Sequence, residues 1–142
     1  MKPDSRPRVL VVDDLKTNRF LLEEALAESG IEVLAAEGGK RALEIVSASQ
    51  PEVVLIDFQM PGLNGAVTAR RIKQQAAQSG APFSYVILMS GYREVEDREL
   101  ADCAADRFLA RPFAVEDLRA AVDEGLRVAR ERRAAAHHLR NQ

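Results

Sequence analysis

Val53-Val54-Leu55-Ile56-Asp57 is the stretch that decides the fold, because four apolar residues run without a break and end in a carboxylate. A short apolar run rich in β-branched residues is typical of a strand that is covered on both faces. Comparable runs occur at 9–12, 33–36 and 85–89, and a weaker one occurs at 108–110. Five strands of this kind indicate a parallel sheet.

Helical patterns of apolar residues separate these runs. They predict helices over 18–29, 42–46, 66–76, 95–104 and 115–129, of which the one over 95–104 is the least apolar. Gly30, Pro51 and Gly80 are expected to end the first three. Five strand–helix units joined by right-handed crossovers predict an α/β fold, a doubly wound (βα)5 domain with helices on both faces of the sheet.

The bulk composition fits one domain with a full hydrophobic core. The chain has 142 residues, of which 46% are hydrophobic and 30% charged, an ordinary globular balance. Its apolar runs fall far short of the ~20 residues of a membrane-spanning helix, and no signal-peptide segment opens the chain. Cys103 is the only cysteine, which excludes a disulfide framework and a cysteine metal cluster. We therefore expect a cytoplasmic protein without membrane contact.

The net charge of −2 is divided unevenly along the chain. Residues 127–142 contain five arginines and one glutamate and carry +4, so residues 1–126 carry −6. An acidic body argues against direct nucleic-acid binding by the domain itself.

Polar side chains follow four of the predicted strands. Asp13 and Asp14 follow the first, Asp57 the third, Ser90 the fourth and Arg111 the fifth. Each alone has an ordinary explanation, since such an aspartate often caps a helix, a serine before glycine makes a turn and an arginine is a surface charge. Ligand sites in open α/β sheets, however, form at the carboxyl ends of strands. The joint occurrence therefore predicts one site.

Three carboxylates in one crevice repel one another and need a cation. Oxygen ligands suit Mg²⁺, and no histidine or cysteine lies near these strand ends to favour zinc. A metal, a hydroxyl and a positive side chain would suffice for a carboxylate to accept a phosphoryl group as an aspartyl-phosphate.

The motifs that contain these residues resemble those of response-regulator receiver domains, the CheY-like family of two-component signalling. They are Val11-Val12-Asp13-Asp14, Asp57 with Met60-Pro61-Gly62 and Gly65, Met89-Ser90-Gly91, and Phe108 with Arg111-Pro112-Phe113. The resemblance covers roughly residues 7–128 and implies a flavodoxin-like fold with strand order 2-1-3-4-5. Residues 129–142 are then a basic helical extension or the start of a linker.

The resemblance also implies a role for each acid. Asp57 would be the phosphoacceptor, and a histidine kinase, a phosphotransfer protein or a small phosphodonor would phosphorylate it. Asp14 and Asp57 would hold Mg²⁺, Asp13 would act largely through water, and the backbone carbonyl of Gln59 would be a further ligand. Such a domain would be no enzyme beyond slow self-catalysed phosphorylation and dephosphorylation.

Two further residues would carry the switch. Ser90 would donate a hydrogen bond to a phosphoryl oxygen, and Phe108 would be the aromatic that rotates, although a packed edge-strand aromatic is an equal alternative. The face of the fourth helix, fifth strand and fifth helix would then be remodelled, which leaves room for a homodimer through it.

One residue departs from the family pattern. Arg111 stands where these domains carry lysine, and it either forms a bidentate pair with Asp57 or points to solvent. Both arrangements would weaken the coupling of phosphate to the fifth strand, so the alternative function is an interaction module that no longer switches by phosphorylation. The Arg111–Pro112 bond is a candidate cis peptide.

Two positions are associated in this family with the lifetime of the phosphate. Here they are Gln59 and Tyr92. The Tyr92 ring either shields the aspartyl-phosphate from water or is simply a loop aromatic.

The basic end and the enzyme alternatives complete the expectations. The helix after Leu126 is a solvated extension, a linker into an output domain absent from this chain, or a dimerising or nucleic-acid-binding arm. A phosphatase of the haloacid-dehalogenase type is disfavoured because Asp13-Asp14 and Asp57-Phe58-Gln59 lack its Asp-x-Asp motif, and no phosphate-binding loop of nucleotide hydrolases is present.

Overall fold

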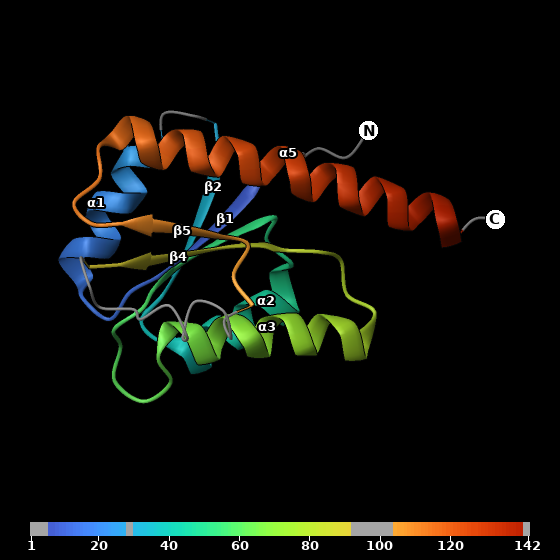
Figure 1. Cartoon of the computed structure of the whole chain (residues 1–142), viewed down its shortest axis with the longest axis horizontal. Helices are drawn as coiled ribbons and strands as arrows, with labels where there is room; N and C mark the ends of the chain where they lie inside the picture. Colours follow the sequence, from blue (N-terminus) through green and yellow to red (C-terminus); the bar gives the residue numbers. More distant parts are fainter. Residues whose placement is uncertain (1–5, 28–29, 92–103, 141–142) are drawn as a thin grey trace.

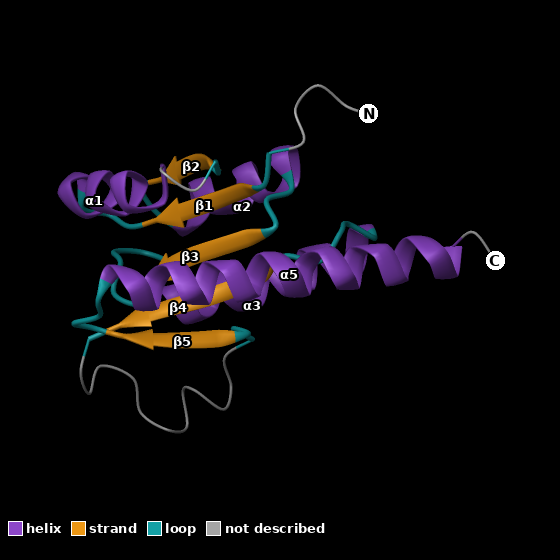
Figure 2. Ribbon diagram, turned by 90° about the horizontal axis from the view of Figure 1, so that it is seen from above, coloured by secondary structure: helices purple, strands orange, loops and turns teal. Residues whose placement is uncertain are grey.

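The computed structural model describes residues 6–27, 30–91 and 104–140. Five parallel strands form one sheet in the order β2-β1-β3-β4-β5. The strands are β1 (Arg8–Val12), β2 (Glu32–Ala36), β3 (Val53–Asp57), β4 (Tyr85–Ser90) and β5 (Arg107–Ala110). This is the predicted flavodoxin-like α/β fold, and Figure 2 shows the strands side by side in that order.

Four helices are described, and they cover both faces of the sheet (Figure 1). They are α1 (Lys16–Ala27), α2 (Gly39–Ser49), α3 (Gly65–Ser79) and α5 (Val115–Arg140). The helix predicted over 95–104 lies outside the described residues, except for residue 104. None of the described helices combines the length and the apolarity needed to cross a membrane.

The two faces of β3 show how the apolar runs build the core. Val53 and Leu55 pack with α1 and α5 in one buried cluster, whereas Val54 and Ile56 pack with α2 and α3 in another. All four are completely buried, because successive side chains of a strand point to opposite faces of the sheet and both faces are covered.

The expectation that all five strands are covered on both faces is wrong for the edges. β2 is half-buried along most of its length, and only Leu109 of β5 is buried. Both lie at the ends of the sheet, where each has a single neighbouring strand and fewer helices cover it.

The loop after β3 is fixed at the start of α3. The side chain of Asn64 accepts a hydrogen bond from the N–H of Val67 at 2.9 Å and so caps the helix. The N–H of Gly65 donates to the carbonyl of Phe58 at 2.9 Å, and Gly62 has the positive φ of 77° that glycine tolerates. The hydrogen bond from Gly65 to Phe58 therefore closes the loop directly after Asp57, the last residue of β3.

The last turns of α5 are attached to the body through Arg133. Its Nε donates to the carbonyl of Phe83 at 2.7 Å, and its Nη2 donates to the carbonyls of Gln50 and Pro51 at 3.0 Å each. The guanidinium of Arg132 lies 4.8 Å from the centre of the Phe83 ring. The basic helix is thus fastened to the loops that precede β3 and β4.

Candidate functional site

Three carboxylates meet at the carboxyl ends of β1 and β3. Asp13 and Asp14 follow β1, Asp57 ends β3, and one oxygen of each lies within 4.8 Å of the others. Asp13 is completely buried and Asp57 is 5% exposed, whereas Asp14 is only partly buried. Because β1 and β3 are neighbours and parallel, their ends converge, as the sequence predicted.

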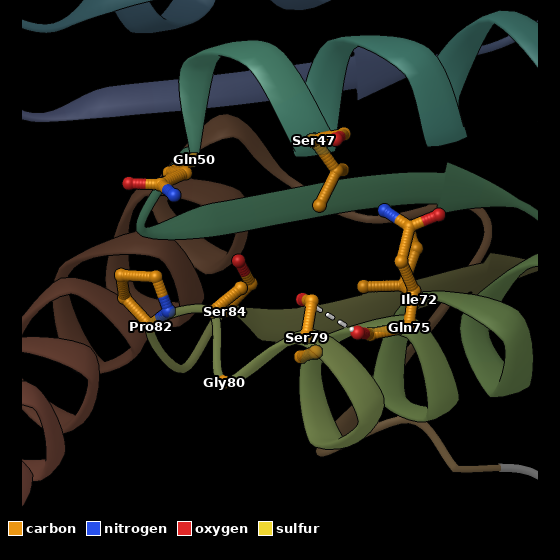
Figure 3. Close-up of a pocket in the computed structure, with 11 residues that line it drawn as sticks. Ser47, Gln50, Ile72, Gln75, Ser79, Gly80, Pro82 and Ser84 are labelled. Carbon is orange, nitrogen blue, oxygen red and sulfur yellow. Dashed lines mark hydrogen bonds between the residues drawn. The ribbon is translucent and has the colours of Figure 1, made fainter.

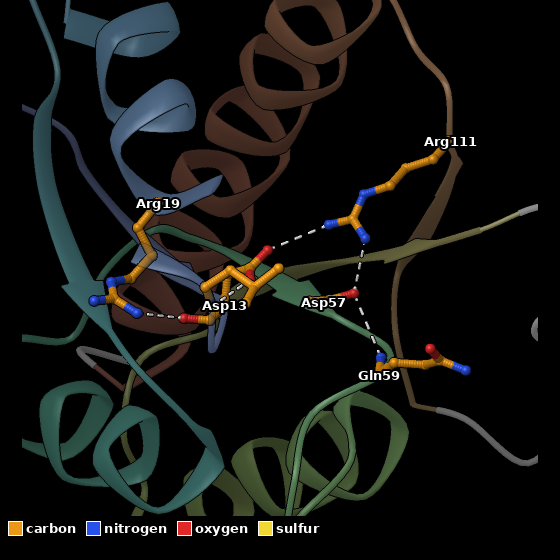
Figure 4. Close-up of polar contacts among 6 residues, drawn as sticks. Asp13, Arg19, Asp57, Gln59 and Arg111 are labelled. Atoms are coloured by element: carbon orange, nitrogen blue, oxygen red, sulfur yellow. Dashed lines mark hydrogen bonds and ion pairs between the residues drawn. The ribbon is translucent and has the colours of Figure 1, made fainter. Parts of the chain in front are cut away.

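Arg111 reaches into this cluster and contacts two of the three acids (Figure 4). Its Nη1 donates to Asp57 Oδ1 at 3.0 Å, and its Nη2 donates to Asp13 Oδ2 at 3.3 Å. Neither sequence alternative, a bidentate pair with Asp57 or a solvent-facing side chain, describes this bridge between two strands. The backbone N–H of Arg111 donates to the carbonyl of Ser90 at 2.7 Å, and the Arg111–Pro112 peptide is cis, as predicted.

Backbone groups fix the orientation of the two buried carboxylates. The N–H of Leu15 donates to Asp13 Oδ1 at 2.9 Å, and the N–H of Gln59 lies 3.4 Å from Asp57 Oδ1. Arg19 of α1 donates to the backbone carbonyl of Asp13 at 2.8 Å. Arg19 could not be assigned to the site from the sequence, because nothing about an arginine on the first turn of a helix indicates that it will contact the carbonyl of a residue in the preceding loop.

Burial raises the pKa of the Asp57 carboxyl above its ordinary value of 3.8. The positive charge of Arg111 lowers that pKa, the charge of Asp13 raises it, and the hydrogen bonds from Arg111 and Gln59 lower it again. Burial has the largest effect, so the pKa of Asp57 is raised and the ionised carboxylate is disfavoured in the folded protein. A site of this kind favours any ligand that brings more positive charge.

The donor set fits a hard divalent cation. Carboxylate oxygens are the ligands that Mg²⁺ prefers, and the ion usually keeps several waters as well. Asp14 makes no hydrogen bond or ion pair with the described residues, so its carboxylate is available on the more exposed side of the cluster. Three ionised acids and Arg111 together carry −2, which one divalent cation would neutralise, and Arg19 contacts only the backbone carbonyl of Asp13.

Three of the remaining predicted residues lie on β4, on β5 and in the loop after β3. Ser90 ends β4 and is buried, Gln59 is exposed in the loop after β3, and Phe108 in β5 is 38% exposed. Phe108 pairs in register with Leu88. Tyr92 lies outside the described residues, and its shielding of the aspartyl-phosphate stays a prediction.

A second hollow lies at the opposite edge of the sheet, between the ends of α2 and α3 (Figure 3). It has a volume of about 470 Å³. All of its lining residues are uncharged, and the hydroxyl of Ser84 is already used as a donor to the carbonyl of Pro51 at 2.7 Å. The chemistry therefore belongs to the charged cluster at Asp57.

Residues 9–123 match the sequence model of the response regulator receiver domain. The chain belongs to the response-regulator receiver domain family. Receiver domains are regulatory phosphoacceptors that bind Mg²⁺ at an acidic pocket, and they are not typical enzymes. The acidic cluster of this receiver domain is Asp13, Asp14 and Asp57.

Individual relatives agree with this assignment. The chain is 37% identical over 120 residues to the uncharacterized transcriptional regulatory protein YrkP of Bacillus subtilis, covering 84% of this chain and 49% of that protein. It is 32% identical over 120 residues to sporulation initiation phosphotransferase F of Bacillus subtilis, covering 84% and 93%. The crystal structure of response regulator TrrA from Thermotoga maritima, in complex with Mg²⁺ and BeF, is similar with a TM-score of 0.73 and 31% identity, covering 84% and 99%.

Several relatives are much longer than this receiver domain. It spans about half of YrkP, 12% of sensor histidine kinase GacS of Pseudomonas protegens and 10% of virulence sensor protein BvgS of Bordetella bronchiseptica. Receiver domains of this sequence type therefore occur both in regulators and within kinases.

Proposed function

We propose that this receiver domain accepts a phosphoryl group on Asp57 from a histidine kinase or a phosphotransfer protein, and that it acts as a cytoplasmic signalling switch. The observation that carries the proposal is the convergence of three carboxylates within 4.8 Å at the ends of two adjacent strands. Family membership supports the same reaction. Sporulation initiation phosphotransferase F, which this chain matches over 93% of its length, is named as a phosphotransferase.

In the proposed reaction, an oxygen of Asp57 attacks the phosphorus of the donor. The new bond joins that oxygen to phosphorus, and the bond that breaks joins phosphorus to the donor's imidazole nitrogen or leaving oxygen, which departs with the electron pair. Oδ2 is the oxygen of Asp57 that neither Arg111 nor Gln59 contacts, and we assign it as the nucleophile.

Asp13, Asp14, Asp57 and the backbone carbonyl of Gln59 would hold Mg²⁺. When bound, the ion would neutralise the charge that develops on the transferred oxygens. Arg111 supplies a second positive charge at the same place, and Ser90 can donate its hydroxyl to a phosphoryl oxygen. These are the positioning and neutralising groups that phosphoryl transfer requires.

The output would be a change of the surface around β5 and the start of α5. Phe108 and Val115 are exposed apolar residues on this surface, and Phe108 lies on β5, three residues before Arg111. A partner effector, an output domain or a second copy of the chain would bind there. Residues 7–128 would form the switching unit, and the basic helix beyond would extend it.

Intact mass after incubation with acetyl phosphate and MgCl₂ tests the proposal. Wild-type protein should gain the mass of one phosphoryl group, and Asp57→Asn should gain none. Asp123→Asn, which changes an exposed aspartate of α5, is the matched control and should behave as wild type. Phosphorylation of Asp57→Asn at the wild-type level would contradict the assignment.

The bridge made by Arg111 favours a second candidate, a receiver that binds a partner without switching. The guanidinium already pairs with both Asp13 and Asp57, so part of the negative charge of the resting pocket is offset before any phosphoryl group arrives. Two-dimensional amide spectra before and after phosphorylation distinguish the two functions. Shifts confined to the pocket favour the non-switching module, whereas shifts that extend through β5 and the first turn of α5 favour the switch.

A further inference from the structure

Arg111 uses both terminal nitrogens of its guanidinium in the resting pocket. One nitrogen contacts Asp57 Oδ1 at 3.0 Å, and the other contacts Asp13 Oδ2 at 3.3 Å. The two carboxylates are almost fully buried, while the arginine side chain is 31% exposed. The guanidinium therefore closes the solvent side of the two acids that lie deepest.

The oxygens left to a metal are fewer than three carboxylates suggest. Asp13 Oδ1 accepts from the N–H of Leu15 and Asp13 Oδ2 accepts from Arg111, so both oxygens of this side chain are engaged. Asp57 Oδ1 is shared by Arg111 and the N–H of Gln59. The carboxylate that remains open to a metal is Asp14, because the second oxygen of Asp57 is the one that we assign as the nucleophile.

From this geometry we propose that Arg111 competes with Mg²⁺ for the acidic pocket, so that the ion binds fully only when the guanidinium releases Asp13. The proposal deepens the proposed function and rests on it, because the pocket is the same one. Arg111 then sets the Mg²⁺ concentration at which Asp57 becomes able to accept a phosphoryl group.

The choice of arginine accounts for the competition. A guanidinium is planar and forked, so it can hold two carboxylates at once, whereas a lysine ammonium is a compact point charge on a flexible stem. Charge-assisted hydrogen bonds to buried carboxylates are among the strongest polar contacts in proteins. A single arginine that makes two of them must lose at least one for the Asp13 oxygen to face a hydrated ion.

Isothermal titration calorimetry of the metal-free chain with MgCl₂ measures the competition directly. Arg111→Gln should bind Mg²⁺ about tenfold more tightly than wild type, the change that one lost charge-assisted contact is worth. Arg111→Lys should fall between the two, because it keeps the charge but not the fork. Circular dichroism of each variant checks that it is folded, and Arg111→Lys carries the test if Arg111→Gln is not.

Lys16→Gln is the control for a general effect of charge. Lys16 is exposed on the first turn of α1, so its loss should change the Mg²⁺ affinity less than twofold under screening by salt. Equal tightening in Lys16→Gln and Arg111→Gln would overturn the competition, as would unchanged or weaker Mg²⁺ binding in the Arg111 variants. Absence of Mg²⁺ binding in folded wild type and all variants would instead overturn the metal site of the proposed function, and with it this inference.

Discussion

Gly65 offers a sharp test of how the phosphoacceptor end of β3 is built. A methyl group added at Gly65 would lie 2.8 Å from the Cα of Phe58 and 2.7 Å from the Cδ1 of Leu88, and it would overlap the carbonyl oxygen of Asp57 still more closely. Two of these three atoms belong to the backbone and cannot rotate away. We therefore expect Gly65→Ala to move the end of β3 itself.

The size of the effect follows from these distances. Ordinary contacts of a Cβ atom begin near 3.4 Å, so the backbone must move by more than half an ångström at two points. Overpacking in a buried site costs about 1–3 kcal/mol, and a rigid backbone neighbour places Gly65→Ala at the upper end of that range. For a domain of this size, 3 kcal/mol lowers Tm by roughly 6–12 °C.

Urea unfolding of Gly65→Ala beside Gly38→Ala measures this cost. Gly38 is the residue before α2, has an extended φ of −173° and has open space around its missing side chain. Its substitution should cost about 1 kcal/mol or less, through a weaker helix cap alone. Phosphorylation by acetyl phosphate should also slow in Gly65→Ala, because Asp57 moves with its carbonyl. A Gly65→Ala protein within about 0.5 kcal/mol of wild type would refute the steric argument.

Three further perturbations follow from contacts described above. Asp57→Asn should stabilise the metal-free protein at pH 7, because burial raises the pKa of Asp57 and the ionised form is then disfavoured in the fold. The gain should shrink as the pH falls toward 3.8 and the carboxyl becomes protonated, and urea midpoints between pH 4 and pH 8 in EDTA would show it. Asn64→Ala should cost about 1 kcal/mol in the same assay, since it removes the cap bond to Val67. Arg133→Ala should speed amide exchange in the last turns of α5, whereas Arg130→Ala, an exposed neighbour, should leave it unchanged; equal exchange in both variants would show that the carbonyl contacts do not hold the helix.

The parallel sheet and the position of its acidic site could be predicted because the sequence shows at which end of each strand the aspartates lie. Apolar runs that end in Asp13 and Asp57 place both carboxylates at one edge, whatever the details of packing. Family membership and the observed strand order confirm the fold that the resemblance implied. The end of α3 also followed from a local signal, since Gly80 takes the left-handed conformation that ends this helix. The bounds of α2 did not, because the helix runs over Gly39–Ser49 rather than 42–46 and Gln50 takes the left-handed conformation at its end.

Contacts made by long, flexible side chains were not predictable in the same way. Arg111 could reach one acid, two acids or solvent, and its choice depends on the positions of strands that are distant in sequence. Arg133 binds carbonyls that lie 50 and 83 residues away in the chain. Lys73 likewise pairs with Asp106 at 2.7 Å. No periodicity or local motif encodes such pairings.

The attachment of Arg133 fixes the direction of the basic end of α5. Buried residues from Leu118 to Ala129 hold the earlier turns of the helix against the sheet, and the carbonyl contacts of Arg133 lie one turn further on. With a rise of 1.5 Å per residue, about 27 Å of helix lies between Val115 and Arg133, and about 10 Å lies beyond Arg133 up to Arg140. The turns beyond Arg133 therefore continue the helix axis from an anchored point, and their basic side chains are presented in a defined orientation relative to the sheet.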